Sequence, residues 1–263
     1  MIRFTVVTIT YNAEAVLQRT LDSVLCQTYK DVEHLIIDGA STDRTLALAE
    51  AYKRQSDSSE ENRHQVIIAS KPDHGIYDAM NKGLTQASGD YIIYMNAGDS
   101  FPAADTLEQV VRRCRLNELP TAELPGVLYG NTDIVDGEGR YLRPRRLQPP
   151  ERLTWRSFRH GMLVCHQAFY ARTNIAKNLL FDTRYRFSAD VDWCIRVMRE
   201  SERVGLPLSN IGIVVANYME EGVTTKNHKA SLCERYLVMQ RHYGAVQTFL
   251  LHCWFVVRAV VRS

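Results

Sequence analysis

The feature that most constrains the fold is a short apolar run that ends abruptly in a polar turn. Tyr91 to Met95 is apolar, aromatic and β-branched, and Gly89 precedes it closely. Because both faces of the run are apolar, the pattern predicts a strand buried inside a parallel sheet. The run stops at Asn96-Ala97-Gly98-Asp99, which is typical of a turn. Ligands of open α/β sheets bind at the carboxyl ends of strands, so Asp99 is expected either at a ligand site or as a cap of the turn or next helix.

The same strand–turn–helix pattern recurs along the first hundred residues. Apolar runs predict strands over residues 4–10, 32–37 and 66–69. Helical periodicity predicts helices from residue 13 to about 25 and over residues 43–54 and 76–87. Asn12 is expected to cap the first helix, and Ser41 or Thr42 the second. This repetition predicts right-handed crossovers and a parallel sheet.

A second set of elements is predicted after Asp99. The patterns indicate a helix over 102–117, a hairpin of 127–135 with 139–143, a strand at 163–171, helices at 173–180 and 190–199, a strand at 211–216 and C-terminal helices at 229–243 and from 246. With 263 residues the chain is long enough for one large domain. We expect a catalytic domain over residues 1–215, made of a nucleotide-binding half (1–100) and an acceptor half (101–215). A C-terminal helical extension (216–263) follows.

Composition excludes several classes of protein. The net charge of +2 does not favour a nucleic-acid partner. The six cysteines contain no C-x-x-C pair, so reduced core thiols are expected instead of a zinc site. The fingerprints of dinucleotide-binding, P-loop and zincin proteins do not occur. The first residues do not have the pattern of a signal peptide, and we therefore expect a cytoplasmic protein.

Acidic residues follow several of the predicted strands. They are Asp38 with Asp43, then Asp73, then Asp99. A single such residue is more often a helix cap than a ligand. Several of them at one edge of a sheet, with an asparagine nearby, suit Mg²⁺ or Mn²⁺. The residues therefore predict an α/β enzyme that binds a phosphorylated nucleotide together with a divalent cation.

An ordered set of motifs resembles the family 2 glycosyltransferases of the GT-A fold. The main motifs are Thr8-Ile9-Thr10-Tyr11-Asn12, Ile36-Ile37-Asp38-Gly39-Ala40-Ser41-Thr42-Asp43, Gly75-Ile76-Tyr77-Asp78-Ala79-Met80-Asn81-Lys82-Gly83, Asn96-Ala97-Gly98-Asp99 and Ala189-Asp190-Val191-Asp192-Trp193. They span most of residues 4 to 200 in the family's order. Their form is similar to the branch that builds bacterial surface polysaccharides of the colanic-acid type. The resemblance implies a Rossmann-like, mostly parallel central sheet flanked by helices.

The resemblance also implies a role for individual residues. Thr10, Tyr11 and Asn12 would line the nucleotide site, and Asp38 with its turn would meet the uracil and ribose. The residues near the donor would be Asp73, Asn81, Lys82, Asn96, Ala97 and Gly98, with Lys82 facing the diphosphate. Asp99 would hold the metal, Mg²⁺ or Mn²⁺. Asp190 would be the general base that takes a proton from the acceptor hydroxyl in a single inverting displacement.

The implied reaction is hexosyl transfer from a nucleotide-sugar, a UDP-sugar, to a glycan or a lipid-linked oligosaccharide. Asn96 and Gly98 replace acidic positions of the usual metal motif, so the cation is expected to rest on Asp99 and the diphosphate alone, with weaker affinity. Gly39 replaces a second aspartate, which leaves the base of the nucleotide open. The missing Gln-x-x-Arg-Trp motif favours a single addition over polymerisation. The alternatives are a sugar-phosphate nucleotidyltransferase, whose Gly-rich N-terminal loop is missing, and a non-catalytic nucleotide-sugar-binding module.

Several residues keep two interpretations at this point. Asp192 is an alternative base or only an acid in the first turn of a helix. His166 and His228 are expected to be a structural and a surface histidine, with roles at the acceptor and the metal as the alternatives. Tyr77 and Trp193 either stack on sugars or belong to the core. The apolar stretch 249–261 is too short to span a bilayer. It is expected to pack on the domain, to pair two copies as a homodimer, or to place 249–262, with Arg258 and Arg262, at the inner face of the cell membrane.

Overall fold

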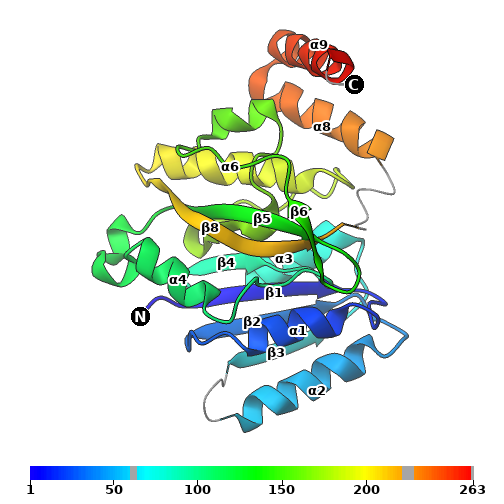
Figure 1. The fold of residues 1–263 in the computed structure, drawn as a ribbon, viewed down its shortest axis with the longest axis vertical. Helices are drawn as coiled ribbons and strands as arrows, with labels where there is room; N and C mark the ends of the chain where they lie inside the picture. Colours follow the sequence, from blue (N-terminus) through cyan, green and yellow to red (C-terminus); the bar gives the residue numbers. More distant parts are fainter. Residues whose placement is uncertain (60–63, 221–227, 262–263) are drawn as a thin grey trace.

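Four parallel strands form the first half of a single sheet. β1 (Phe4–Thr10), β2 (Val32–Asp38), β3 (Gln65–Ser70) and β4 (Tyr91–Tyr94) lie in the order β3-β2-β1-β4. The register places Thr10, Asp38 and Ser70 next to one another at the carboxyl ends of β1, β2 and β3. The computed structural model describes residues 1–59, 64–220 and 228–261 (Figure 1).

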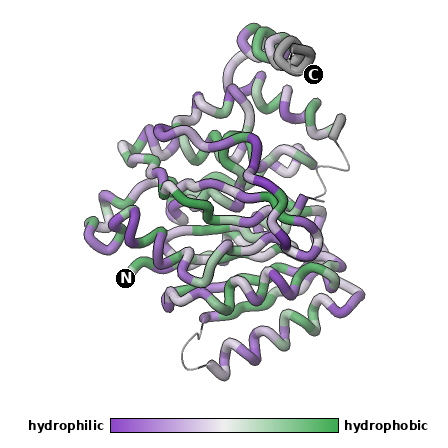
Figure 2. Tube along the Cα trace, viewed as in Figure 1, coloured by the Kyte–Doolittle hydropathy of each residue, from purple (hydrophilic) through white to green (hydrophobic). Residues whose placement is uncertain are grey.

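Three helices cover opposite faces of these strands. α1 (Leu17–Leu25) and α2 (Thr45–Ser58) bury Leu21 and Tyr52 against Ile36. α3 (Ile76–Gln86) packs on the other face, where Gly83 approaches Val7 and Ile37. Adjacent strand residues point to opposite faces, which is why Ile36 and Ile37 meet different helices. Figure 2 shows the hydrophobic residues concentrated along the central strands.

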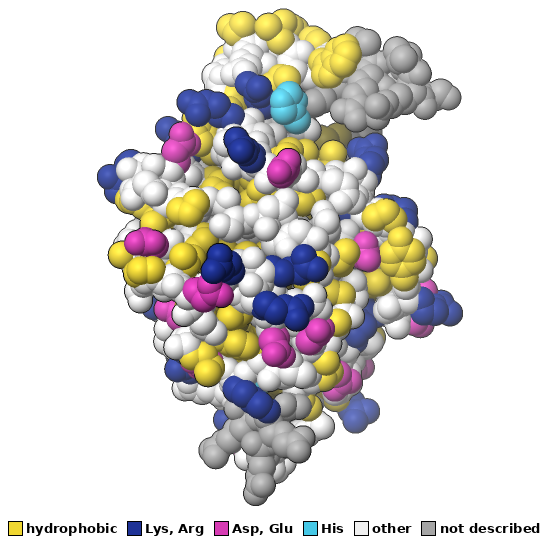
Figure 3. Space-filling model, turned by 60° about the vertical axis from the view of Figure 1, so that its left-hand side comes forward, with side chains coloured by type: hydrophobic (Ala, Val, Ile, Leu, Met, Phe, Trp, Pro, Cys, Tyr) yellow, Lys and Arg dark blue, Asp and Glu magenta, His cyan; other side chains and the backbone are white. Residues whose placement is uncertain are grey.

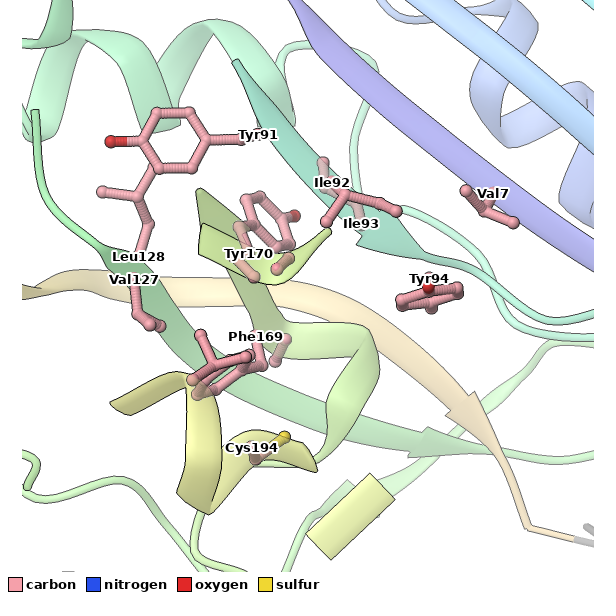
Figure 4. Packing of buried hydrophobic residues seen from close by; sticks show 14 of the residues in the cluster. Val7, Tyr91, Ile92, Ile93, Tyr94, Val127, Leu128, Phe169, Tyr170 and Cys194 are labelled. Atoms are coloured by element: carbon pink, nitrogen blue, oxygen red, sulfur yellow. The ribbon is translucent and has the colours of Figure 1, made fainter. Parts of the chain in front are cut away.

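The second half of the sheet contains the antiparallel strands. β7 (Phe169–Arg172) pairs with β4, β5 (Val127–Val135) pairs with β7, and β6 (Tyr141–Pro144) completes the predicted hairpin with β5. β8 (Leu208–Met219) runs parallel to β5. Apolar side chains of β4, β5 and β7 pack together in the core (Figure 4). The predicted fold class, a mostly parallel sheet flanked by helices, is confirmed.

The helical segments between β4 and β8 are short, apart from α6. They are α4 (Thr106–Arg113), α5 (Thr173–Ala176), α6 (Ala189–Arg203) and the 3₁₀ segments η1 (Leu116–Glu118), η2 (Thr121–Glu123), η3 (Trp155–His160) and η4 (His166–Ala168). The boundary predicted at residue 215 falls inside β8, which continues to Met219. The division into domains stays a prediction.

Two helices begin later than predicted. Residue 12 has a left-handed φ of 46°, and its Oδ1 accepts from Thr42 N, so Asn12 does not cap α1 as predicted. Residues 14–16 form a turn, and α1 begins at Leu17, not at residue 13. Residues 102–105 are likewise not α-helical, since the carbonyl of Ala103 accepts from Gln27 Nε2 and that of Ala104 from Thr28 N (2.8 Å each).

The strand predicted over 163–171 is mostly wrong. Only Phe169–Arg172 form a strand. The carbonyl groups of Met162 and Leu163 accept hydrogen bonds from the Arg145 side chain, and Ala168 N donates to Cys165 O. These contacts turn the chain into η4 before it can pair with β4.

The C-terminal helices form one end of the molecule (Figure 1). α8 (His228–Tyr243) packs on α6, and α9 (Ala245–Val261) packs on α8 and η3. Within the described ranges, no helix combines the length and hydrophobicity needed to cross a bilayer. The predictions for the side chains of His228 and Arg258 and for Arg262 concern positions outside those described.

Candidate active site

The turn after β4 is held in place by α1. Thr20 Oγ1 donates to the carbonyl of Asp99 (2.7 Å) and accepts from the N–H of Gly98 (2.9 Å). Arg19 Nε donates to the carbonyl of Gly98 (3.1 Å). Gly98 has a φ of 100°, and a Cβ there would lie 2.7 Å from Met219 Cε. Glycine is therefore required at position 98 by both the backbone and the space available.

The carboxylate of Asp99 is buried beneath this turn. It is 4% exposed, and its oxygens accept from Gln167 Nε2 (2.8 Å) and from the N–H of Met219 (3.1 Å). Burial raises the pKa of Asp99 to about 6, although these two hydrogen bonds act to lower it. Asp99 is thus fixed by side chains from the middle and the end of the chain.

Asp190 lies in the first turn of α6 and receives three hydrogen bonds. Its Oδ1 accepts from the Tyr77 hydroxyl (3.1 Å) and from Val191 N (3.0 Å), and its Oδ2 accepts from His166 Nδ1 (3.1 Å). Its side chain remains 14% exposed. Burial acts to raise the pKa of Asp190, but the hydrogen bond from His166, the charge of Arg235 and the Tyr77 hydroxyl together lower it.

Two consecutive residues of η4 join the two carboxylates. His166 contacts Asp190, and Gln167 contacts Asp99. Asn96 Nδ2 contacts His166 Nε2 (3.0 Å), so the turn after β4 also reaches the Asp190 side. Burial and the charges of Asp99, Cys165 and Asp190 raise the pKa of Tyr218 in β8 to about 12. The arrangement brings the two acids predicted from sequence into one site.

Asp192 faces away from this site and anchors the C-terminal extension. Its fully buried carboxylate accepts from Arg196 Nε (2.6 Å) and contacts His242 Nε2 of α8 (2.8 Å). Burial acts to raise the pKa of Asp192, and these partners lower it below its ordinary range. Asp192 therefore ties α6 to α8 and has no exposed oxygen.

The loops after β1 and β2 are connected by reciprocal hydrogen bonds. Asn12 N donates to Ser41 Oγ and Asn12 Oδ1 accepts from Thr42 N (2.9 Å each). Tyr11 beside them is 64% exposed. Thr10 is buried, and its Oγ1 has no hydrogen-bond partner among the described residues. An exposed aromatic ring and a buried hydroxyl thus lie at the predicted nucleotide edge.

Asp38 and Asp73 occupy different positions at this edge. The buried Asp38 carboxylate accepts from Ser41 N (3.0 Å) and Ser70 Oγ (2.6 Å), so it shapes its own turn. Asp73 is half-buried. A Cβ on Gly39 would lie 2.6 Å from Asp73 Oδ2, so the Asp73 carboxylate takes the space that a second aspartate at position 39 would need.

Asn81 and Lys82 have protein partners in this structure. Asn81 Nδ2 donates to the carbonyl of Phe181 (3.0 Å), and Asn81 Oδ1 accepts from the N–H of Phe181 (2.7 Å). The Asn81 side chain therefore joins α3 to the second half of the chain, whereas the resemblance implied that it lies near the donor. Lys82 Nζ donates to the carbonyl of Pro72 (2.9 Å) and pairs with Asp78 (3.1 Å).

The described residues offer limited support for a metal. Among them, no three His, Cys, Asp or Glu side chains converge on one point. Asp99 provides a single carboxylate, and each of its oxygens already accepts one hydrogen bond. A hard cation would therefore take its other ligands from substrate phosphates and water, as Mg²⁺ commonly does.

Sequence reasoning missed the residues that support the site. Arg19, Thr20 and Gln167 fix the turn after β4 and the Asp99 carboxylate. They come from segments far apart in sequence, and none stands in a pattern that predicts a contact with Asp99. Tyr77 stacks on Phe181 (5.7 Å), which stacks on the buried Trp193 (4.6 Å), so both aromatic residues belong to the core.

Comparison with known proteins gives consistent matches. The model of glycosyl transferase family 2 matches residues 5–179. A PGL/p-HBAD biosynthesis glycosyltransferase from Mycobacterium bovis is 31% identical over 220 residues, which cover 83% of this chain and 77% of that protein.

Two solved structures have the same fold. Staphylococcus aureus TarS 1-349, in complex with UDP-GlcNAc, superposes with a TM-score of 0.70 at 19% identity. This match covers 90% of the present chain, which spans 64% of the TarS chain. The mannosyltransferase PcManGT from Pyrobaculum calidifontis, in complex with GDP-Man and Mn²⁺, has a TM-score of 0.62 at 18% identity, over 95% of this chain and 68% of its own.

Proposed function

The chain belongs to glycosyl transferase family 2, and we propose that it transfers a sugar from a UDP-sugar to a hydroxyl group of a glycan or lipid-linked oligosaccharide. The observation that carries this proposal is the pairing of two carboxylates through η4. His166 holds Asp190 and the next residue, Gln167, holds Asp99. Two acids in unlike environments, one partly exposed and one buried, suit two separate roles in one reaction.

Asp190 is the general base in this proposal. Its pKa is lowered, so it is ionised at neutral pH, and its side chain is 14% exposed. Three hydrogen bonds orient it, and a free lone pair can accept the proton of an acceptor hydroxyl. The hydroxyl oxygen then attacks the anomeric carbon from the side opposite the nucleotide, which inverts the configuration.

Asp99 is the proposed residue for Mg²⁺ or Mn²⁺. The bound cation would neutralise the charge that grows on the departing diphosphate. The carboxylate is attached to the turn Asn96–Asp99, and α1 fixes this turn through Arg19 and Thr20. The complex of PcManGT with GDP-Man and Mn²⁺ supports a divalent cation in the proposed reaction.

The edge formed by the loops after β1 and β2 is the proposed nucleotide site. The exposed ring of Tyr11 can stack on a base. Asp73 takes the place of the missing acid at position 39 and supplies a second acceptor there. The TarS complex contains UDP-GlcNAc and the PcManGT complex contains GDP-Man, so proteins of this fold bind uridine and guanosine nucleotides. Of these two, we propose UDP for this chain.

The base assignment is tested with Asp190→Asn and its neighbour Asp192→Asn. UDP release from UDP-glucose, UDP-galactose and UDP-N-acetylglucosamine would be followed with the wild type to identify a donor. We expect Asp190→Asn to lower the rate about 100-fold or more, the size of general-base catalysis, without a change in thermal stability. Asp192→Asn should keep the rate within about threefold. It should lose about 1–3 kcal/mol of unfolding free energy, because Arg196 and His242 lose their negatively charged partner. An active Asp190→Asn beside a folded but inactive Asp192→Asn would contradict the assignment.

A further inference from the structure

A continuous chain of hydrogen bonds runs from the turn after β4 to Asp190. Asn96 Nδ2 lies 3.0 Å from His166 Nε2, and His166 Nδ1 lies 3.1 Å from Asp190 Oδ2. The His166 side chain is 13% exposed, so the contacts are largely shielded from water. Asn96 is thereby connected to the Asp190 carboxylate, although the resemblance places it beside the diphosphate.

The hydrogen-bond partners define the protonation of the imidazole. A neutral imidazole donates from one ring nitrogen and accepts at the other. The carboxylate of Asp190 can only accept, so His166 Nδ1 carries the proton. His166 Nε2 then accepts from the Asn96 amide, which is the group that the structure places there.

The residue type at position 96 decides whether this neutral form is stable. A carboxylate at position 96 would place an acceptor oxygen against His166 Nε2, which in the neutral ring is also an acceptor. Two acceptors repel each other unless the ring takes up a second proton at Nε2. The amide avoids this conflict. The remaining amide oxygen, Asn96 Oδ1, is buried without a partner among the described residues.

We propose that His166 is a positioning residue for the Asp190 carboxylate and that Asn96 holds His166 as the neutral Nδ1–H imidazole. The departure from an acidic residue at position 96 thus serves the base, not the metal. The catalytic part of this inference rests on the proposed role of Asp190. No proton is transferred to His166, which only donates the hydrogen bond that orients the carboxylate.

Other charged and titratable groups also face the Asp190–His166 pair. They are Tyr77 of α3, Asp99 after β4, Cys165 beside η4, Cys194 of α6, Tyr218 of β8 and Arg235 of α8. Arg235 is the cation among them and favours ionised Asp190. Among the described residues, none of these groups forms a hydrogen bond with the His166 ring, so a change at position 96 or 190 acts on that ring most directly.

The first test observes the ring itself and needs no substrate. Long-range ¹H–¹⁵N NMR of the uniformly labelled protein at pH 7.5 reads which ring nitrogens carry protons, and His166→Gln assigns the signal among the eight histidines. We expect the Nδ1–H tautomer in the wild type and a doubly protonated ring in Asn96→Asp. Asp190→Asn should remove the tautomer preference. The inference is overturned if the ring is the Nε2–H tautomer in the wild type or if neither substitution changes it.

The second test follows the pH dependence of UDP release from the donor that the wild type uses. In His166→Ala the carboxylate loses a donor that lowers the pKa of Asp190, so the acid limb of kcat/KM should move to higher pH and kcat should fall about 10-fold to 100-fold. His166→Gln retains an amide donor and should recover part of this loss. UDP affinity should stay within about twofold in both variants.

His242→Gln is the matched control. His242 of α8 lies 2.8 Å from Asp192, which is on α6 like Asp190. The substitution therefore removes a comparable histidine–aspartate pair outside the site. It should lower thermal stability and leave the acid limb in place. An acid limb that moves equally in His242→Gln and His166→Ala would overturn the inference. A fully active Asp190→Asn would instead refute the proposed base, while the NMR result would still decide whether His166 holds its carboxylate.

Discussion

His34 is a buried residue whose ionisation couples the core to pH. It is fully buried, with Nε2 2.9 Å from Thr8 Oγ1 and Nδ1 2.7 Å from the Tyr52 hydroxyl. Burial, followed by the charge of His64, lowers the pKa of His34 to about 3. The unfolded chain therefore binds a proton between about pH 6.5 and pH 3 that the folded chain does not. Stability from this group is complete above that window and is lost as the pH falls through it.

We expect the free energy of unfolding to fall by about 3 kcal/mol between pH 7 and pH 4 through this group. In His34→Gln this part of the pH dependence should disappear, while stability at pH 7 decreases because the packed ring is lost. Urea unfolding at several pH values measures the difference. The exposed His74→Gln serves as the control and should keep the wild-type slope. An unchanged slope in His34→Gln would contradict the argument.

At the scale of elements, α3 depends on a close approach to the sheet at Gly83. A Cβ at this position would lie 2.4 Å from Val7 Cγ1 in β1. Gly83→Ala should therefore destabilise the protein by about 1–3 kcal/mol, although alanine favours a helix. The double variant Val7→Ala with Gly83→Ala removes the opposing methyl groups and should cost less than the sum of the two single substitutions. Thermal unfolding measures this coupling, and purely additive losses would contradict it.

The elements that could be predicted from sequence are those whose patterns are local. The run Tyr91–Met95 and the helix after Gly75 were predicted within one or two residues, because burial and turn residues coincide there. The start of α1, the start of α4 and the segment 163–168 were not. Asn12 before α1 bonds to Ser41 and Thr42, and backbone groups of the other two segments bond to Gln27 and Arg145, which are distant in sequence. No periodicity in a single sequence reports such contacts.

The same distinction applies to the candidate site. Asp99 and Asp190 stand in motifs that can be recognised, and they lie in one site. Gln167 and Arg19 are single polar residues in unremarkable surroundings, and only the fold brings them to Asp99 and Gly98. The family motif favoured Asp190 as the base but left Asp192 as an alternative. The contact of Asp192 with His242 depends on how α8 packs on α6.

At the scale of the whole molecule, α9 presents an apolar face. Phe249, Leu250 and Trp254 are 59%, 62% and 57% exposed, and Val246 precedes them at the same helical spacing. Figure 3 shows hydrophobic side chains gathered at the end formed by the C-terminal helices, with Lys and Arg side chains below them. The last twenty residues contain Arg258 and Arg262 and no acidic residue. An exposed apolar helix face, at an end of the molecule where Lys and Arg side chains also lie, suits the surface of an anionic membrane.

We therefore propose that α9 docks on the surface of an anionic membrane, where a lipid-linked acceptor would be found. The triple variant Phe249→Gln, Leu250→Gln and Trp254→Gln should bind phosphatidylglycerol-containing vesicles at least about 100-fold more weakly, because it lacks three exposed apolar side chains that the membrane would bury. Co-sedimentation measures binding. The control variant Leu232→Gln with Leu237→Gln, exposed on α8, should bind as the wild type does. Equal binding of all three proteins would contradict the proposal, and a dimer that only the triple variant loses would favour pairing of two copies.

We propose that Asp99 and Asp190 belong to one donor site and perform different tasks in it. The most direct measurement is a calorimetric titration of UDP, with and without Mn²⁺, into the wild type, Asp99→Asn and Asp190→Asn. Asparagine retains the size of each side chain and removes its charge. We expect Mn²⁺ to strengthen UDP binding in the wild type and in Asp190→Asn, and we expect this effect of Mn²⁺ to be lost in Asp99→Asn. If Mn²⁺ strengthens UDP binding equally in all three proteins, Asp99 does not hold the cation. If the folded wild type binds no nucleoside diphosphate, the proposed donor site is wrong.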